Sequence, residues 1–160
     1  MAVDPLELAR FFQAETLGAP DRAVGFVLWR VMHRYQRAVD RALAPLDLTH
    51  LQFTTLAMTG WLCRTGEPVT QSMLAQRADI HAMQVSLMLR ALEGKNMVAR
   101  RPSPADVRAK QVEITPTGLA ALRRAMPIVI ALQRRIFGTD GAPDGALLVS
   151  LRAVEAGADG

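Results

Sequence analysis

The stretch from Val69 to Ile114 constrains the fold most, because the elements that it predicts follow each other with no spare residues between them. Thr70 can cap the start of a short helix over residues 71–77, and a tight turn over residues 78–80 comes next. A second helix is expected from about His81 to Lys95. Two short helices joined in this way are typical of a helix-turn-helix.

The second helix is expected to be half buried, because its apolar residues recur on one side at the helical spacing. These residues are Val85, Met88, Leu89 and Leu92. Asn96 ends the helix, since asparagine tolerates the left-handed conformation that follows a last turn. Residues 98–101 and 107–114 then predict two strands joined by a proline-bearing loop. Helix, turn, helix and hairpin in this order predict a winged helix-turn-helix, a fold that points to DNA.

Four short motifs in this region resemble those of the multiple-antibiotic-resistance regulator (MarR) family of bacterial transcription factors. Residues 48–53 (LTHLQF) resemble the opening of that family's second helix, and residues 92–98 (LEGKNMV) resemble the exit of its DNA-recognition helix. Residues 106–108 (DVR) match the Asp-x-Arg pattern of its wing, and residues 114–118 (ITPTG) resemble the start of the next helix. The four motifs occur in the right order and at compatible spacings, which makes them a stronger signal than any one alone.

The fold class that follows is mainly α with a small β-hairpin wing, an α+β winged helix-turn-helix with N- and C-terminal dimerisation helices. We expect one domain over residues 1–160, with the DNA-binding unit at 48–115 and helical dimerisation regions at 5–47 and 116–156. Further helices are expected over residues 5–17, 21–44, 49–63, 116–137 and 144–156. Asp21 is expected to cap the second of these, and Pro127 to kink the fourth. In the helix over residues 49–63, we expect Phe53, Leu56, Ala57, Gly60 and Trp61 to be buried.

The charge of the chain is concentrated in the predicted DNA-binding unit. The formal net charge is +4, and residues 69–111 alone hold seven basic and three acidic residues, a difference of four. Such a patch is the electrostatic footprint of a polyanion, although arginine-rich surfaces also occur without this role. Four arginines at positions 30, 34, 37 and 41 share one helical face, for which a solvated face is favoured over phosphate contacts.

The second helix of the unit presents its non-buried side as the candidate for reading base edges. Helical geometry places Met83, Ser86, Leu87 and Arg90 opposite the buried side, with Ala82 and Gln84 at its flanks. The MarR family usually has polar or basic residues at the positions of Ala82, Met83 and Leu87. Here Met83 and Leu87 are expected to contact thymine methyl groups, with Gln84, Ser86 and Arg90 as polar readers. The alternative is that the helix is rotated and both apolar residues are core.

The flanking elements are expected to hold the DNA backbone and the minor groove. Thr70 and Ser72 at the start of the first helix, and Lys110 in the hairpin, are candidate DNA contacts. Arg108, near the hairpin tip, is expected to enter the minor groove. The resemblance implies that Asp106 orients the wing by pairing with an arginine, while an aspartate in a turn alternatively bonds its own backbone.

The resemblance implies a homodimer built from the terminal helices, and the residues support this in part. The apolar content of residues 116–156 exceeds what one narrow core-facing stripe needs, as expected if a partner covers some of it. A larger intramolecular core is the alternative. Many family members are repressors relieved by small aromatic ligands, and Trp29, Arg30, His33 and Trp61 lie on helices that would line such a pocket. Each of these four also has an ordinary core or surface explanation.

Other classes of function fit the sequence less well. The three histidines have no metal-site spacing, and no phosphate loop or nucleophile elbow occurs, so we expect neither an enzyme nor a cofactor. The single cysteine, Cys63, is expected to be a structural thiol, with a thiol-based redox sensor as the alternative. No apolar run is long enough to span a bilayer and no secretory signal is seen, so a cytoplasmic location is expected. A helical protein-interaction module with degenerate DNA binding stays open.

Overall fold

The computed structural model describes residues 2–102 and 110–158, and it divides the chain into two compact units. The first unit ends at Ala38 and the second begins at Val39, so the division falls inside one helix, α2 (Val24–Leu43). The described part of the chain is mainly helical, with one two-stranded antiparallel hairpin, as the sequence predicted. The prediction of a single domain stays a prediction.

The first unit contains α1 (Pro5–Glu15), a short 3-10 helix (Pro20–Arg22) and most of α2. Asp4 caps α1, since its carboxylate accepts from the Leu6 amide at 3.0 Å. The expected cap of α2 by Asp21 is wrong. Asp21 lies in the 3-10 helix, and α2 starts at Val24 because the chain first makes this extra turn after Pro20.

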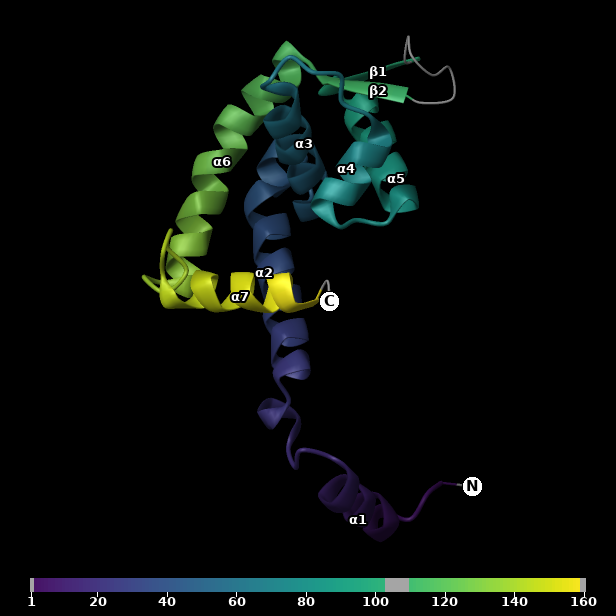
Figure 1. Cartoon of the computed structure of the whole chain (residues 1–160), viewed down its shortest axis with the longest axis vertical. Coiled ribbons are helices and arrows are strands. Elements are labelled where there is room, and N and C mark those ends of the chain that lie inside the picture. The colour runs from purple at the N-terminus through teal and green to yellow at the C-terminus, as the bar shows by residue number, and fades with distance from the viewer. Residues whose placement is uncertain (1, 103–109, 159–160) are drawn as a thin grey trace. The chain divides into compact units, whose positions relative to one another are not determined.

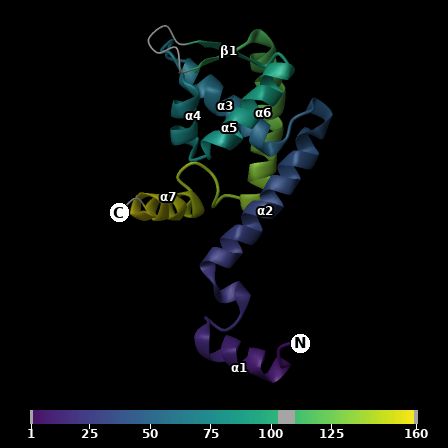
Figure 2. The ribbon, with the colours of Figure 1, turned by 90° about the vertical axis from the view of Figure 1, so that its right-hand side faces the viewer.

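The second unit holds the remaining elements, which Figures 1 and 2 show from two directions. They are a 3-10 helix (Ala44–Leu46), α3 (His50–Cys63), α4 (Gln71–Ala78), α5 (Ala82–Gly94), β1 (Val98–Pro102), β2 (Lys110–Ile114), α6 (Pro116–Phe137) and α7 (Ala146–Ala158). Helix α4 lies beside α5 in both views. The hairpin lies at the end of the unit where α6 begins.

Three threonines fix the starts of helices in this unit. Thr49 begins α3 with a capping box, in which its hydroxyl accepts from the Gln52 amide and the Gln52 side chain accepts from the Thr49 amide. Thr70 caps α4 as predicted, and Thr115 caps α6 by accepting from the Gly118 amide at 3.0 Å. The predicted left-handed end after α5 is confirmed, since Asn96 has φ 56°.

Helix α3 forms the centre of the core, where it contacts α4, α5, β2 and α6. Leu56 of α3, Leu74 of α4 and Leu89 of α5 are fully or almost fully buried. Three of the five residues of α3 that were expected to be buried are not. Trp61 is 61% exposed, and its ring stacks against the Arg64 guanidinium instead of packing in the core. Ala57 and Gly60 are only half buried.

The last two helices carry apolar residues on their surfaces. Helix α6 continues through Pro127, and α7 starts at Ala146, two residues later than expected. The reason for the late start is that Asp144 has φ 66°, and the amides of Leu147 and Leu148 bond instead to the backbone carbonyl of Asp140. Residues 146–157 of α7 include no buried side chain.

Candidate nucleic-acid interface

Helix α5 presents the predicted face to solvent. Met83 is 67% exposed and Leu87 is 50% exposed, while Val85, Leu89 and Leu92 on the opposite side are buried. The rotated alternative, in which Met83 and Leu87 belong to the core, is therefore wrong. Gln84 and Arg90 are also exposed and Ser86 is half buried, so the helix offers an apolar pair flanked by polar groups.

The amino end of α5 is held by a residue that the sequence analysis had not singled out. The Nδ1 atom of His81 accepts from the Met83 amide at 3.3 Å, so the histidine caps the helix. The position of His81 directly before Ala82 could have indicated a cap from the sequence. Serine, threonine, aspartate and asparagine are the usual caps, however. The cap fixes the backbone of Met83, the first of the two exposed apolar residues.

Helix α4, which packs on α5, is joined to the hairpin at its start. The carbonyl of Val69 accepts from the Val112 amide at 2.8 Å, and Thr70 forms a β-bridge with Gln111. The Thr70 hydroxyl also accepts from the Met73 amide at 3.2 Å, which directs it along the helix axis, whereas Ser72, two residues later in the first turn, is exposed. The start of α4 is therefore fixed to β2.

The hairpin has a regular antiparallel register, in which Val98 pairs with Ile114 and Pro102 with Lys110. Lys110 is exposed at the first position of β2. Asp106 and Arg108, the predicted wing support and minor-groove contact, lie outside the described residues.

Three of the basic groups in the predicted patch are already paired within the protein. Arg100 pairs with Glu93, Lys95 lies 3.1 Å from the Asp47 carboxylate, and Arg101 lies 3.7 Å from that of Glu113. Among the described residues, Arg77, Arg90 and Lys110 make no ion pair. Among the described residues, fewer basic groups are therefore available to a polyanion than the count of basic residues indicated. They lie on α4, on α5 and at the loop end of the hairpin, where β2 begins.

The carboxyl end of α5 is fixed to the elements around it. The hydrogen bond from Arg100 lowers the pKa of Glu93, whose carboxylate lies at the end of α5. The Lys95 ammonium donates to the Asp47 carbonyl and, at 3.1 Å, to Oε1 of Gln52 near the start of α3. These contacts hold the exposed face of α5 in a constant orientation relative to β1 and α3.

The residues expected to bind an effector do not fall in one unit. Trp29, Arg30 and His33 belong to the first, where the rings of Trp29 and His33 have centroids 4.3 Å apart and the Arg30 guanidinium lies over Phe26. Trp61 belongs to the second. The effector role of all four stays a prediction.

Cys63 is half buried at the end of α3, and its thiol donates a 3.5 Å hydrogen bond to the Val112 carbonyl of β2. This contact supports a structural role in fixing α3 to the hairpin. Within residues 2–102 and 110–158, no three histidine, cysteine or acidic side chains are grouped to hold a metal ion. No described helix combines the length and apolarity needed to cross a membrane.

Comparisons with known proteins agree with this architecture. The sequence model of the MarR family matches residues 48–110. The HTH-type transcriptional regulator YdcH of Bacillus subtilis is 36% identical over 118 residues, which cover 74% of this chain and 80% of that protein.

Two similar solved structures are of the regulator CouR. The transcriptional repressor CouR bound to a 23-mer DNA duplex has a TM-score of 0.72 and 28% identity, covering 88% of this chain and 97% of the other. CouR from Rhodococcus jostii RHA1 bound to p-coumaroyl-CoA has a TM-score of 0.70 and 26% identity, covering 85% of this chain and 91% of the other. With its winged helix-turn-helix and these relatives, the chain belongs to the MarR family of DNA-binding transcriptional regulators.

Proposed function

We propose that this protein is a repressor that binds a pseudo-palindromic operator as a homodimer, and that a small organic ligand releases it. The observation that carries the DNA-binding part is the exposed face of α5, where Met83, Leu87 and Arg90 face solvent on a helix that is capped at one end and fixed by ion pairs at the other. A helix fixed in this way fits the major groove of DNA.

In this proposal, α5 reads base edges and the other exposed groups bind phosphates. Met83 and Leu87 contact thymine methyl groups, while Gln84, Ser86 and Arg90 supply hydrogen bonds. Ser72 in the first turn of α4 and Lys110 at the loop end of the hairpin lie on the other elements of the winged helix-turn-helix and are proposed to contact the DNA backbone. The hydroxyl of Thr70, which accepts a bond from the Met73 amide, keeps its proton to donate to a phosphate oxygen. Arg108 enters the minor groove, with Asp106 as support.

The dimer is proposed from the apolar surface of the last two helices. Ile128 and Ile130 of α6 and Val149 and Leu151 of α7 are all more than one third exposed. A soluble monomer seldom leaves so many large apolar side chains in water on adjacent elements. Burial of this surface against a second copy would present two α5 helices to two half-sites about one helical turn apart.

Repression and ligand release are proposed from the relatives. CouR is a repressor with structures on DNA and with p-coumaroyl-CoA. In such a regulator, a ligand lowers operator affinity when it binds the DNA-free conformation more tightly than the DNA-bound one.

The test is to select bound fragments from genomic DNA, footprint them, and measure the mass of the protein in solution. We expect a dimer that protects a pseudo-palindromic site with half-sites ~10 bp apart. A monomer that protects a single unrepeated site would overturn the proposal. A protein that binds no DNA fragment would instead be a helical interaction module, with the apolar face of α5 as its contact surface.

A further inference from the structure

The turn between α4 and α5 is fixed by backbone hydrogen bonds. Asp79 is left-handed with φ 48°, and the amides of Asp79 and Ile80 both donate to the Ala75 carbonyl of α4. The next residue, His81, has non-helical backbone angles, φ −55° and ψ 132°, and its carbonyl accepts from the Gln84 amide at 2.8 Å. The chain is therefore held on both sides of His81.

The ring of His81 caps α5 in one tautomer. Its Nδ1 atom accepts from the Met83 amide at 3.3 Å, and among the described residues no other group accepts from this amide. An imidazole nitrogen accepts a hydrogen bond only while it carries no proton, so the proton of the neutral ring is on Nε2. Because His81 is exposed, its ring can exchange protons with solvent while the core stays intact.

Protonation of the ring would remove this cap. The imidazolium carries a hydrogen on each nitrogen, so Nδ1 could no longer accept, and its N–H would point at that of Met83. The positive charge would also lie at the amino end of α5, where the helix dipole is already positive. Both effects act in the same direction, so the cap is present while His81 is neutral. It is lost as the pH falls through the range in which histidines titrate, roughly 8 to 5.

The described charged groups around α5 form no ion pair with this ring. The elements packed against α5 are α3, α4 and β1. Together with the turn and α5 itself, they carry the charged or titratable residues His50, Cys63, Arg77, Asp79, Arg90, Glu93, Arg100 and Arg101. No ion pair of the described residues includes His81, and Glu93 and Arg100 pair with each other at the far end of the helix.

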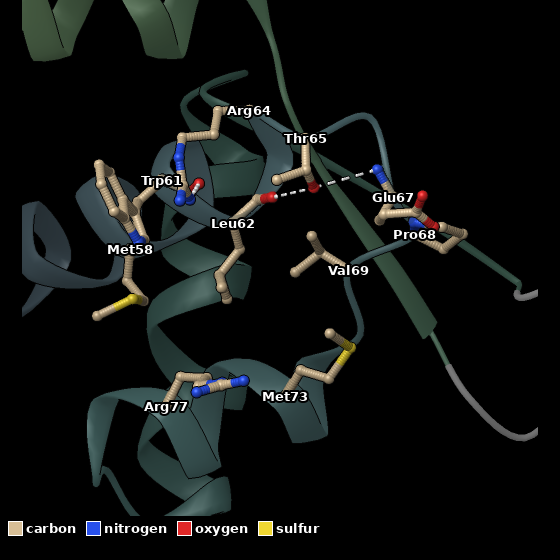
Figure 3. Close-up of a pocket in the computed structure, with 10 residues that line it drawn as sticks. All are labelled: Met58, Trp61, Leu62, Arg64, Thr65, Glu67, Pro68, Val69, Met73 and Arg77. Atoms are coloured by element: carbon tan, nitrogen blue, oxygen red, sulfur yellow. Dashed lines mark hydrogen bonds between the residues drawn. The ribbon is translucent and has the colours of Figure 1, made fainter.

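Arg77 and Asp79 are the nearest of these groups along the chain. Arg77 lines a cleft between α3 and α4, where Figure 3 shows it on the same side of α4 as Met73. Asp79 is exposed in the turn. An acidic group favours the protonated ring and a basic group disfavours it, so the effects of these two residues oppose each other. The bond to the Met83 amide is therefore the contact that distinguishes the two states of the ring.

The cap positions the first turn of α5, which carries part of the proposed reading face. Met83 is 67% exposed and Gln84 is exposed beside it. A helix without its cap leaves amides unsatisfied and frays at its first turn. Arg90 comes nine residues after His81, about 13 Å along the axis, so fraying would not reach it. Loss of the cap would displace Met83 and Gln84 while the rest of the helix stays in place.

We propose that the neutral His81 ring positions the base-reading turn of α5, and that protonation of this ring lowers the preference of the protein for its operator. This inference rests on the proposed function. Mild acid would release the operator, whereas phosphate contacts, which need no capped turn, would keep binding to random DNA. The quantity to measure is the ratio of operator affinity to random-DNA affinity, because titration of other groups near phosphates changes both affinities.

The first measurement uses the full-length protein without DNA. Ring-nitrogen and amide NMR signals are followed between about pH 8 and 5, and His81 is assigned by its absence in His81→Asn. At the alkaline end we expect the proton on Nε2 and none on Nδ1, and the Met83 amide signal should move with the same midpoint as the ring. In His81→Asn the Met83 amide should not titrate, because asparagine caps a helix without changing its charge. A proton on Nδ1 at the alkaline end, or a Met83 amide that is indifferent to the ring, would overturn the proposal.

A matched pair of variants connects the cap to DNA binding. His81→Asn keeps a capping oxygen that does not titrate, and His81→Ala has no cap. At about pH 7.5, the affinity ratio of His81→Asn should equal that of the wild type, and that of His81→Ala should be about fivefold lower, as expected for the loss of one cap. At about pH 5.5, the wild-type ratio should fall toward that of His81→Ala, while His81→Asn keeps its ratio.

The outcomes separate the cap from the proposed function. If the ratio of His81→Asn falls in acid as the wild-type ratio does, the pH dependence belongs to another group and the proposal is wrong. It is also wrong if His81→Ala matches the wild type at neutral pH. Operator affinity that rises in acid only when His81 is present would make the charged ring a phosphate contact instead. A protein that binds no operator at either pH, with the NMR titration as expected, would contradict the proposed function and leave the proton-sensitive cap intact.

Discussion

Arg100 on β1 donates a hydrogen bond from its Nε to Oε2 of Glu93, 3.0 Å away near the end of α5, and its NH2 group donates to the same oxygen. The arginine side chain is 13% exposed and the glutamate side chain 40% exposed, so the pair lies at the edge of the core. It joins the helix proposed to read DNA to the strand that leads into the hairpin. Its loss would therefore affect both stability and the placement of the wing.

The first prediction concerns acid. Because the pKa of Glu93 is lowered in the folded protein, the pair stabilises the fold above the ordinary glutamate pKa and loses this contribution as the pH falls through the lowered value. Glu93→Gln should cost about 0.5–1 kcal/mol of unfolding free energy at pH 7, a small value because the glutamate is partly exposed. Urea unfolding should show this difference shrinking below pH ~4. Glu113→Gln, whose partner is 3.7 Å away, is the control. A difference that persists unchanged in acid would contradict the assignment.

The second prediction concerns Gly118 in the first turn of α6. A Cβ atom there would lie 2.0 Å from the Met97 carbonyl oxygen, so the chain after α5 approaches α6 too closely for any side chain. Gly118→Ala should lower the unfolding free energy by about 2 kcal/mol or more. Gly94→Ala is the control, because nothing lies within 4 Å of that position. It should be neutral or slightly stabilising in a helix. Equal unfolding midpoints for the two variants would exclude the clash.

The elements of the second unit could be predicted because their signals are local. Thr70 as a cap, Asn96 in the left-handed conformation and the buried side of α5 each depend on residues within a few positions. The exposed side of α5 follows from the same periodicity. The residues proposed to read DNA therefore lie on the side of α5 that the sequence predicted to be exposed.

Features set by tertiary contacts could not be predicted in this way. Trp61 was expected in the core, but the apolar residues of α3 are spread around the helix, so their spacing does not say which side is covered. A count of charges does not show that Arg100 and Lys95 are paired with acidic residues. Lys95 pairs with Asp47, which lies 48 positions earlier in the sequence. The late start of α7 has a local cause, the Asp140 carbonyl and a left-handed Asp144, which the helical pattern does not reveal.

The third prediction concerns the proposed dimer. Val149 on α7 is 58% exposed, and a charge placed there would have to be buried if a second copy covers this face. Val149→Lys should raise the dimer dissociation constant about tenfold or more. Sedimentation at graded concentrations measures this constant. Ser150→Lys adds the same charge at the neighbouring exposed position and is the control. Its dimer dissociation constant should rise less than that of Val149→Lys. Wild-type association by both variants would show that α7 does not contribute this surface.

The fourth prediction concerns phosphate contacts. Lys110 is exposed at the start of β2 and makes no ion pair with a described residue, so it is free to bind a phosphate. Lys110→Ala should weaken binding to operator and random DNA alike, and it should reduce the log–log salt slope by about one. Lys95→Ala is the control, because its ammonium is already bound to Asp47 and Gln52. Its salt slope should match that of the wild type. A weakening confined to the operator would assign Lys110 to base reading instead.

The fifth prediction separates base reading from backbone binding. Met83 and Leu87 are exposed on α5 and are proposed to contact thymine methyl groups. Replacement of either by alanine should cost ~1 kcal/mol of operator affinity and leave binding to random DNA almost unchanged. Titrations against operators with uracil in place of single thymines give the matching test, since uracil lacks only the methyl group. The wild-type protein should bind less tightly when uracil replaces a contacted thymine. The alanine variant of the side chain that contacts this thymine should bind both operators equally. If the wild type binds every uracil-substituted operator as well as the original, these two side chains do not read thymine, and the exposed apolar face of α5 must serve another contact.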